Sequence, residues 1–434
     1  MRILVISNSE WDDNNSFGNT FNNFFSGIED VEIANIYCRE GHPNTKICSR
    51  FLKICDKDLV KSIIHKNYDP AKVVFSSEDN KKNTSDSSRN IFDFIKRKRW
   101  SIFFILREIL WSFSNYKKQT FKDFIEDFSP DLIFLPTYSF AYINKMALYI
   151  QKKYNLPMVS YMSDDEYSFR RLKISPLFWI LRFYQSKWSV KGLRKSKLVY
   201  VISETQKNEC KKDLNIECKV LTKCADFSDD KKPEFKVPEK VLKMVYAGNI
   251  SKGRYEILSK LAKSVEEINK ESKKFELDIY TLTALTDKQK ICLSTDAVHL
   301  HPPVSYEKIR EIQKNSDILL HVECFNLQEK LEVHQSFSTK IVDYLETNRC
   351  IFAIGDDYCA SIQYFMKNDC GIVAKNSNEI KSCLLKLSQN QDLLRYYAEK
   401  AWETGKKNHD KSVVRKMLEN DMEKLSGKIM KGYR

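Results

Sequence analysis

The chain has 434 residues, a formal net charge of +14 and a hydrophobic content of 42%. This length exceeds what one compact core supports, so we expect two domains, and the charge favours an acidic partner such as nucleic acid, an anionic membrane or a phosphorylated substrate. The twelve cysteines form neither a C-x-x-C pair nor a cluster with metal-ligand spacing. This pattern indicates free thiols in a reducing cytoplasm and argues against a disulfide framework or a structural metal centre.

The chain opens with MRILVIS (1–7), which has the pattern of a first strand and lacks the architecture of a signal peptide. Short apolar runs rich in β-branched residues then recur between longer mixed segments, as expected for strands buried on both faces of parallel sheets. Two sets of such runs predict two doubly wound α/β domains. The runs lie at 2–7, 31–37, 131–136, 157–161 and 197–203, and then at 243–248, 276–281, 317–322 and 350–355.

Two segments that follow strands of the first half carry polar residues of interest. SNSEWDDNNSFGNTFNNFF (7–25) is predicted to be a strand-to-helix loop containing Gly18 and Asn19, which either faces a ligand or is an asparagine-rich surface loop. YMSDDEYSF (161–169) places Asp164, Asp165 and Glu166 at the carboxyl end of a strand. These acids either meet a substrate or lie in a solvated loop.

Two segments rich in basic and aromatic residues account for the positive charge. Residues 94–121 contain seven basic residues, one acidic residue and eight aromatic residues, and residues 169–197 contain nine basic residues and no acidic ones. Cations flanking a Trp/Phe/Leu face are typical of helices that lie in a membrane interface. The alternatives are buried apolar helices with snorkelling cations, or a nucleic-acid surface, although no nucleic-acid-binding module is recognisable. No run of 18 apolar residues exists, so no span of the membrane is predicted.

Composition also suggests how the chain is divided. The polar stretch 76–90 is predicted to be a loop within the first domain, and 226–240, with Pro233 and Pro238, is predicted to be an exposed connector. These boundaries predict a domain at 1–225 and a second domain at 241–390. The remaining residues, 391–434, are predicted to be a helical tail that can cross back to the first domain.

The first chemically informative stretch of the second half is VYAGNISKGRYEILSKLAK (245–263), an apolar strand, a glycine turn and a helix. Gly248 permits close backbone approach, and Lys252 and Arg254 near the helix start could neutralise a diphosphate. Strand ends in open α/β sheets are where ligands bind. The stretch matches neither G-x-G-x-x-G nor a Walker A pattern, and the alternative interpretation is a basic turn.

The second informative stretch is FSTKIVDYLETNRCIFAIG (337–355), a helix followed by a buried strand. Ser338 or Thr339 can cap the helix, and a helix N-terminus next to Lys340 suits a phosphate. Asp343 lies one turn after Thr339, about 6 Å along the axis, where its carboxylate could accept hydrogen bonds from ribose hydroxyls. The alternative is a capped helix with a surface ion pair.

Together these residues resemble the donor-binding domain of GT-B-fold glycosyltransferases, especially the retaining family 4 type of bacterial capsule and lipopolysaccharide synthesis. The shared elements are the strand–G–turn–KG–helix unit, with Gly248, Lys252 and Gly253, and the variant S-T-K-I-x-D-Y-L. The family's two glutamates, which have seven residues between them, fall on Gln335 and Asp343. Departures from its pattern are Gln335 itself, Asn249 for an arginine, and Asn348 and Cys350 for a glycine and a proline. The resemblance covers about 240–390 well and 1–220 only in broad layout.

The resemblance implies two Rossmann-like domains facing a cleft, the second binding a UDP- or GDP-sugar and the first a lipid-linked or oligosaccharide acceptor at the inner membrane face. It implies a glycosyltransferase of the hexosyltransferase type, with retention of configuration and without a metal or cofactor. The expected catalytic residues are Lys252, Arg254, Asp164 and Asp165; the expected donor-binding residues are Gly248, Asn249, Ser251, Gln335, Ser338, Thr339, Lys340 and Asp343; and Gly18 and Asn19 are expected on the acceptor side.

Three alternatives remain open at the level of sequence. An inverting transferase on the same fold would use Asp164 or Asp165 as its base. A nucleotide-sugar epimerase would turn over the donor without an acceptor. A non-catalytic membrane-associated scaffold would keep the fold but lack the chemistry, and Gln335 and Asn249 are the residues that make this alternative worth testing.

Overall fold

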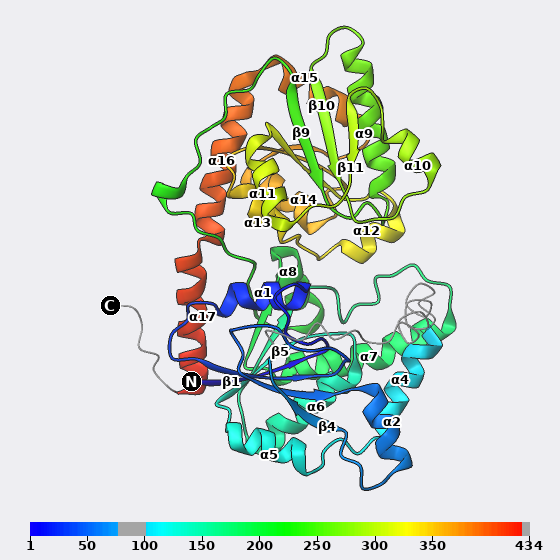
Figure 1. The fold of residues 1–434 in the computed structure, drawn as a ribbon, viewed down its shortest axis with the longest axis vertical. Coiled ribbons are helices and arrows are strands. Elements are labelled where there is room, and N and C mark those ends of the chain that lie inside the picture. The colour runs from blue at the N-terminus through cyan, green and yellow to red at the C-terminus, as the bar shows by residue number, and fades with distance from the viewer. Residues whose placement is uncertain (77–100, 428–434) are drawn as a thin grey trace. The chain divides into compact units, whose positions relative to one another are not determined.

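The computed structural model describes residues 1–76 and 101–427, and the predicted loop at 76–90 therefore lies almost entirely outside the described residues (Figure 1). The chain divides into two compact units. Unit 1 comprises Met1–Ile202, Lys207–Leu221 and Arg415–Arg434, and unit 2 comprises Ser203–Gln206 and Thr222–Val414. The two units therefore share the C-terminal segment 391–434, because its first helix, α16 (Gln391–His409), belongs to unit 2 and the chain from Arg415 onward belongs to unit 1.

Within the described residues, unit 1 is built on an eight-stranded sheet in the order β4-β3-β2-β1-β5-β6-β7-β8. Every neighbouring pair is parallel except β3 and β4, so β4 is an antiparallel edge strand. The five residues of β5 and of β6 are all buried, as the continuous apolar runs predict. The strands are β1 (Arg2–Ser7), β2 (Glu32–Tyr37), β3 (Arg50–Ile54), β4 (Ala71–Val74), β5 (Leu132–Pro136), β6 (Met158–Met162), β7 (Leu198–Val201) and β8 (Cys218–Val220).

The helices of unit 1 differ in what they bury, because α1 and α5 bury aromatic faces whereas α7 buries mostly polar residues. Helix α1 directs Phe21, Phe24 and Phe25 inward at helical spacing, and Phe21 meets the Trp11 ring edge-on at 5.8 Å. Helix α7 begins where the sequence signals it, because Ser175 accepts a hydrogen bond from the Phe178 amide and Pro176 occupies the first turn. The helices are α1 (Ser16–Phe25), α2 (Asp56–Ile64), α4 (Ser101–Phe113), α5 (Gln119–Phe128), α6 (Ala141–Tyr154), α7 (Pro176–Lys195), α8 (Glu204–Leu214) and α17 (Lys411–Ser426).

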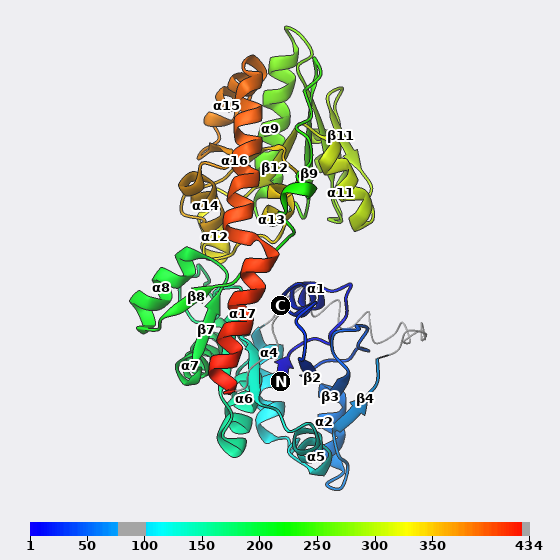
Figure 2. The ribbon, with the colours of Figure 1, turned by 90° about the vertical axis from the view of Figure 1, so that its left-hand side faces the viewer.

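Unit 2 is built on a six-stranded sheet, as far as the described residues go, in the order β11-β10-β9-β12-β13-β14, with every pair parallel. Helices α9 and α15 pack against each other and α15 contacts α16 (Figure 2). The strands are β9 (Leu242–Ala247), β10 (Phe275–Tyr280), β11 (Val298–His301), β12 (Ile318–Val322), β13 (Cys350–Ile354) and β14 (Ile372–Ala374). The helices are the 3-10 turn Asp229–Lys231, α9 (Arg254–Asn269), α10 (Asp287–Cys292), α11 (Tyr306–Asn315), α12 (Leu327–Val333), α13 (Lys340–Leu345), α14 (Ala360–Asn368), α15 (Glu379–Gln389) and α16 (Gln391–His409).

The C-terminal segment packs against residues of unit 2 and forms hydrogen bonds with residues of unit 1. In unit 2, Gly405 of α16 lies so close to the Phe227 ring that a Cβ would come within 2.2 Å of it. In unit 1, Asp421 of α17 accepts hydrogen bonds from the Tyr200 hydroxyl at 2.8 Å and from Lys219 Nζ at 2.6 Å. Helix α17 therefore braces β7 and β8, the last two strands of the first sheet.

Both sheets reverse their strand order at one place. In unit 1 the chain places β2 on one side of β1 and β5 on the other, and in unit 2 it places β10 on one side of β9 and β12 on the other. Ligands of open α/β sheets bind outside the carboxyl ends of the strands at such switch points. The residues that follow β9 and β12 in unit 2, and β1 and β5 in unit 1, are therefore the first places to look for a site.

Candidate functional site

The turn after β9 has an unusual backbone. Lys252 has φ of 57° and Gly253 has φ of 75°, so two successive residues are left-handed before α9 begins at Arg254. A left-handed conformation is strained for lysine, and such strain collects at functional sites. Gly253 also packs tightly, because a Cβ there would lie 3.0 Å from Cys324 Cβ. Lys252 itself is exposed at the start of a 16-residue helix, where the dipole already favours an anion.

Lys340 joins this turn to the second predicted motif, more than ninety residues further along the chain. Its Nζ donates to the Ala247 carbonyl at 2.8 Å, and a Cβ on Gly248 would come within 2.8 Å of the same nitrogen. Gly248 is thus needed to admit the ammonium. Much of the Lys340 side chain is exposed, but desolvation of its ammonium and the nearby Arg254 lower its pKa, against the opposing effect of Asp343. A lysine destabilised in this way gains from the arrival of an anion.

Arg254, the second predicted cation, is tied into the fold. Its Nε donates to the Val322 carbonyl at 2.9 Å and its Nη2 to Glu323 Oε2 at 2.7 Å, at the carboxyl end of β12. Burial raises the pKa of Glu323, and Arg254 counteracts the rise. Neighbouring His321 is held neutral, because burial, Arg254 and Lys340 lower its pKa to about 3. Glu323 was not predicted from the sequence. It orients the Arg254 guanidinium and neutralises part of its charge.

Asp343 lies in a small network of its own. Its Oδ1 accepts hydrogen bonds from Lys223 Nζ at 2.6 Å and from the Tyr306 hydroxyl at 3.1 Å. Burial lowers the pKa of Lys223, but the pair with Asp343 outweighs burial and the net shift is upward. Among the described residues no group donates a hydrogen bond to Oδ2, which leaves this oxygen for a ligand.

The cap predicted for α13 does not form. Thr339 occupies the cap position, but its φ of −58° and ψ of −22° are already helical, so its side chain accepts no hydrogen bond from the helix. The helix has only six residues, and its first turn is closed by the bond from the Ile341 amide to the Ser338 carbonyl at 3.0 Å. Ser338 and Thr339 are half-buried beside Lys340.

The remaining predicted donor residues lie around these groups. Gln335 is 1% exposed; its amide oxygen accepts a hydrogen bond from Gln206 at 3.2 Å, and its carbonyl accepts one from Ser203 at 2.8 Å. Asn249 Oδ1 accepts from the amide of exposed Ser251 at 2.7 Å and fixes the turn that leads to Lys252. The structure thus brings together Gly248, Asn249, Ser251, Lys252, Arg254, Lys340 and Asp343 near the carboxyl ends of β9 and β12.

The predicted acids of unit 1 differ sharply from one another. Asp165 is 6% exposed and pairs with Arg171 at 2.8 Å and with Arg182 at 3.4 Å. Burial raises its pKa, but the two guanidinium groups outweigh burial and the net shift is downward. Such a carboxylate holds the loop after β6 together and is a poor proton acceptor. Asp164 is exposed.

Gly18 and Asn19 were predicted in a loop but lie in the first turn of α1. The Gly18 amide donates to the capping Asn15 side chain at 2.7 Å, and a Cβ on Gly18 would come within 2.0 Å of the Asp12 carbonyl. The asparagine run therefore starts a helix, because Asn15 is an effective N-cap. Asn19 is exposed on this helix.

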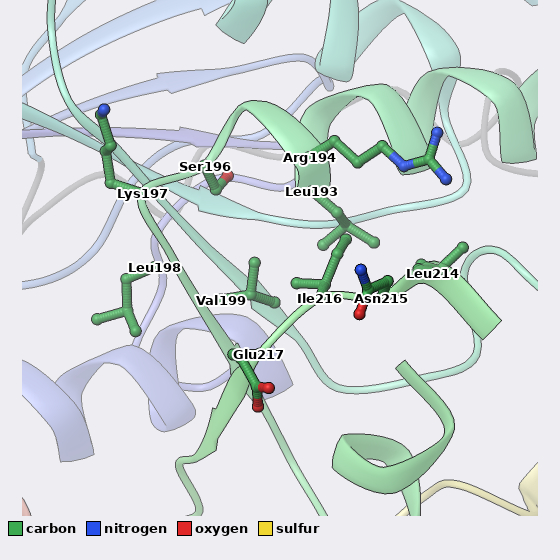
Figure 3. A pocket seen from close by; sticks show the side chains of 10 residues that line it. All are labelled: Leu193, Arg194, Ser196, Lys197, Leu198, Val199, Leu214, Asn215, Ile216 and Glu217. Carbon is green, nitrogen blue, oxygen red and sulfur yellow. The ribbon is translucent and has the colours of Figure 1, made fainter. Parts of the chain in front are cut away.

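A surface hollow of about 660 Å³ lies in unit 1. Figure 3 shows its wall, formed by the end of α7, the start of β7 and the segment before β8. It lies at the amino ends of these strands, opposite the edge where α/β folds bind ligands. None of the predicted site residues lines it.

The described residues contain neither a cluster of metal ligands nor a helix that could span a membrane. No group of three or more His, Cys, Asp or Glu among residues 1–76 and 101–427 could hold a metal ion. Over the same ranges, no helix combines the length and the apolar character that crossing a bilayer requires.

Comparison with solved structures identifies the fold. Sucrose-phosphate synthase from Thermosynechococcus elongatus matches with a TM-score of 0.61 and 9% identity, covering 98% of this chain and 100% of that chain. Anabaena Alr3699/HepE in complex with UDP-glucose matches with a TM-score of 0.59 and 12% identity, covering 98% and 100%. The chain has the GT-B fold. A glycosyltransferase from Rickettsia africae matches with a TM-score of 0.58 and 12% identity, covering 98% of both chains.

Sequence comparisons add nothing to this likeness: no protein-family model matches the chain, and no curated protein does. At identities of 9% to 12%, the structural matches show a common fold and leave the activity to be argued from the residues.

Proposed function

We propose that the protein is a glycosyltransferase that moves a sugar from a nucleotide-sugar to a glycan acceptor. The observation that carries the proposal is the contact of Lys340 with Ala247 and Gly248, because it assembles two distant motifs at the switch point of a GT-B domain. Lysines beside a helix N-terminus are suited to a diphosphate, and a buried carboxylate with an open oxygen is suited to ribose hydroxyls.

In the proposed reaction, unit 2 stabilises the departing nucleoside diphosphate. Lys252, Lys340 and the start of α9 would face the negative charge that develops on the leaving phosphate, and Arg254 would add a guanidinium oriented by Glu323. We propose retention of configuration, in which the acceptor oxygen bonds to the anomeric carbon as the bond to the diphosphate breaks. The leaving phosphate then takes the acceptor proton, so that no side-chain base is required.

The first donors to test carry UDP, since the solved structures of Anabaena Alr3699/HepE hold UDP and UDP-glucose. The proposed ribose contact is Asp343 Oδ2. GDP-sugars remain the second class to test.

We further propose that unit 1 binds an anionic membrane surface and takes a lipid-linked acceptor in surface polysaccharide synthesis. Helices α2, α4 and α7 pack side by side in unit 1 (Figure 1). Among the described residues, these helices and the segment before α7 expose a set of large apolar side chains: Ile63, Ile64, Leu106, Ile109, Phe113, Phe169, Leu172, Ile174, Leu177, Ile180 and Phe183. Scattered apolar residues are normal on a protein surface, whereas a set of this size on neighbouring helices is typical of an interaction site.

The charge distribution along α7 favours a membrane as the occupant. Its exposed residues at helical spacing are first apolar, at Leu177, Ile180 and Phe183, and then basic, at Lys187 and Lys191. The apolar side chains can insert among the acyl chains of a membrane while the lysines contact anionic headgroups. Each cation near such a surface contributes on the order of 1 kcal/mol to binding.

Several cations counted from the sequence do not belong to that surface. Arg107 pairs with Asp56 at 2.9 Å, Arg170 with Asp213 at 2.8 Å, and Arg182 with Asp165. The basic run at 96–99 lies outside the described residues. The membrane proposal therefore rests on apolar exposure and on the lysines of α7, and less on net charge than the sequence suggested.

Turnover tests the proposal and separates it from its alternatives. The purified protein is incubated with UDP-glucose, UDP-galactose, UDP-N-acetylglucosamine or GDP-mannose and a lipid extract of bacterial membranes, and nucleotide release and labelled product are measured. Acceptor-dependent release supports the transferase, and the anomeric configuration of the product separates retention from inversion through Asp164. A changed sugar nucleotide without acceptor indicates an epimerase, and no reaction of any donor indicates a scaffold.

Vesicle flotation tests the membrane surface. Binding to vesicles containing phosphatidylglycerol should exceed binding to neutral phosphatidylcholine vesicles and should fall for Ile180→Glu with Phe183→Glu. A matched control is Val413→Glu, an exposed apolar position on α17. Equal binding of the double variant and wild type would contradict the proposed surface.

A further inference from the structure

One carboxylate at the carboxyl edge of the unit 1 sheet is left without an ion pair. Glu166 follows Asp165 directly, yet the two arginines of this loop pair with Asp165, and none of the described residues forms an ion pair with Glu166. Its carboxylate accepts a hydrogen bond from the Ser139 hydroxyl instead. A half-buried carboxylate that forms no ion pair lowers the stability of the fold, which suggests that it is kept for a function.

The position of Glu166 is that of a ligand-binding residue. It lies four residues after β6, and Ser139 lies three residues after the adjacent strand β5, which borders the switch point of the sheet. Ser139 is itself fixed, because Arg182 Nη1 donates to its hydroxyl oxygen at 3.1 Å. The carboxyl group is therefore held in one place by neighbouring strands of the sheet.

The surroundings of Glu166 keep it near its titration point at neutral pH. Burial and the charge of Asp164 raise its pKa to about 7, and Ser139 and Arg182 moderate the rise. The charged and titratable groups that act on it are Asp164 and Asp165 on its own loop, Tyr138 after β5 and Arg182 on α7. Perturbed groups of this kind, at the ligand edge of a sheet, are candidates for function.

Glu166 is also close in sequence to the apolar surface of unit 1. Phe169, Leu172 and Ile174 follow it within eight residues, and Ile174 is fully exposed. A sugar carried on a membrane lipid would be presented from this side, so the same loop can serve the lipid and its sugar.

We propose that Glu166, supported by Ser139, binds a hydroxyl group of the acceptor sugar. The inference rests on the proposed glycosyltransferase function and deepens it by naming the acceptor-binding residue and the class of ligand, a neutral polyhydroxyl group. The ionised carboxylate accepts the hydrogen bond of the sugar hydroxyl; the protonated group offers a weaker acceptor, so acceptor use should decline as the pH falls below about 7.

Glu166→Gln tests the proposal with UDP-glucose or the other donors above and the membrane-lipid extract as probes. We expect the apparent kcat/KM for the acceptor extract to fall at least about tenfold at pH 8, as for a lost hydrogen bond to a charged group. The increase in Tm on addition of UDP should stay as in wild type, because the donor site lies in unit 2. The decline of acceptor kcat/KM below pH 7 should disappear in the variant.

The control is Glu126→Gln, a glutamate of α5 whose side chain is 53% exposed and which should leave transfer unchanged. Transfer by Glu166→Gln at the wild-type rate, with the same pH profile, would overturn the inference and leave the transferase proposal intact. A wild type that transfers no sugar and whose Tm no nucleotide raises would contradict the proposed function, and the inference would fall with it.

Discussion

The carboxyl edges of the two sheets have the same order of strands at the switch point, and the residues predicted for their sites have charges of opposite sign. In unit 2 the residues after β9 and β12 gather Lys252, Arg254 and Lys340, whereas in unit 1 the loop after β6 gathers Asp164, Asp165 and Glu166. A cationic edge suits a diphosphate, and an anionic edge repels one and suits sugar hydroxyls. The difference is what the proposed function expects, with the donor bound in unit 2 and the acceptor in unit 1.

Both edges contain charged residues that stabilise the fold and charged residues that are available to a ligand. Asp165 in unit 1 and Arg254 in unit 2 are both paired inside the protein. Glu166 in unit 1, and Lys252 in unit 2, lie one or two residues away from those pairs and remain outside them. At each edge, one charged residue (the brace) therefore stabilises the fold through an ion pair, and a nearby charged residue is left to bind a ligand.

The largest effect is expected for the brace in unit 1. Asp165→Asn removes the partner of two largely buried guanidinium groups, and we expect a loss of about 3–5 kcal/mol in the free energy of unfolding. Urea denaturation measures it. Glu217→Gln, which breaks a pair whose carboxylate is 78% exposed, should cost less than about 1 kcal/mol. Equal losses in the two variants would show that Asp165 is not the brace.

The next effect concerns Glu166 and its pH dependence. Its folded pKa of about 7 lies above the ordinary value of 4.5, so the folded state binds the proton more tightly and wild-type stability falls as the pH rises from about 4.5 through 7. We expect Glu166→Gln to lack this fall, and to be more stable than wild type by up to about 3 kcal/mol at pH 8 but not at pH 4.5. Parallel pH–stability curves for the two proteins would refute the raised pKa.

A smaller effect is expected for Asp343, the proposed ribose contact in unit 2. Asp343→Asn should weaken nucleotide binding by roughly 1.5–3 kcal/mol, as for a lost hydrogen bond to a charged group. It should also lower stability, because Lys223 is only 12% exposed and loses its partner. Calorimetric titration of the folded variant with UDP measures the affinity. An unchanged dissociation constant would contradict the assignment of Asp343 to the nucleotide site.

The smallest effect is expected for the residue that orients Asp343. Tyr306→Phe removes the 3.1 Å hydrogen bond to Oδ1 and leaves Lys223 in place. We expect a loss of about 0.5–1 kcal/mol in stability and a decrease in UDP affinity of no more than about threefold. A larger loss of affinity would mean that Tyr306 itself contacts the nucleotide.

Much of the fold could be predicted from the sequence because its signals are local. Continuous apolar runs such as 131–136 mark strands buried on both faces, and the boundaries of β5 and β9 agree with the prediction to within a residue. The short strands β8 and β14 were not predicted, since three residues carry too little pattern. The prediction of a loop at Gly18 is wrong, because Asn15 caps α1 and places Gly18 in its first turn.

The site was predictable only in part, because its contacts are distant in sequence. Gly248 and Lys340 were both singled out by their motifs, but nothing in the sequence said that they touch. Lys223 and Asp343 are 120 residues apart, and Arg254 and Glu323 are 69 residues apart, so neither pair leaves a sequence pattern. Asp165 and Glu166 are adjacent and chemically alike, and only the placement of Arg171 and Arg182 distinguishes them.

The most direct test of the central claim is a thermal-shift panel with UDP, GDP, ADP and CMP on wild type, Lys340→Met and Lys263→Met, the last being an exposed lysine further along α9. A nucleotide at a hundred times its dissociation constant stabilises the folded state by about 2.7 kcal/mol, enough for a clear rise in Tm. We predict that one nucleotide raises the Tm of wild type and Lys263→Met, and that the rise is much smaller for Lys340→Met. An equal rise in all three proteins, or in none, would contradict a donor site at the switch point of unit 2.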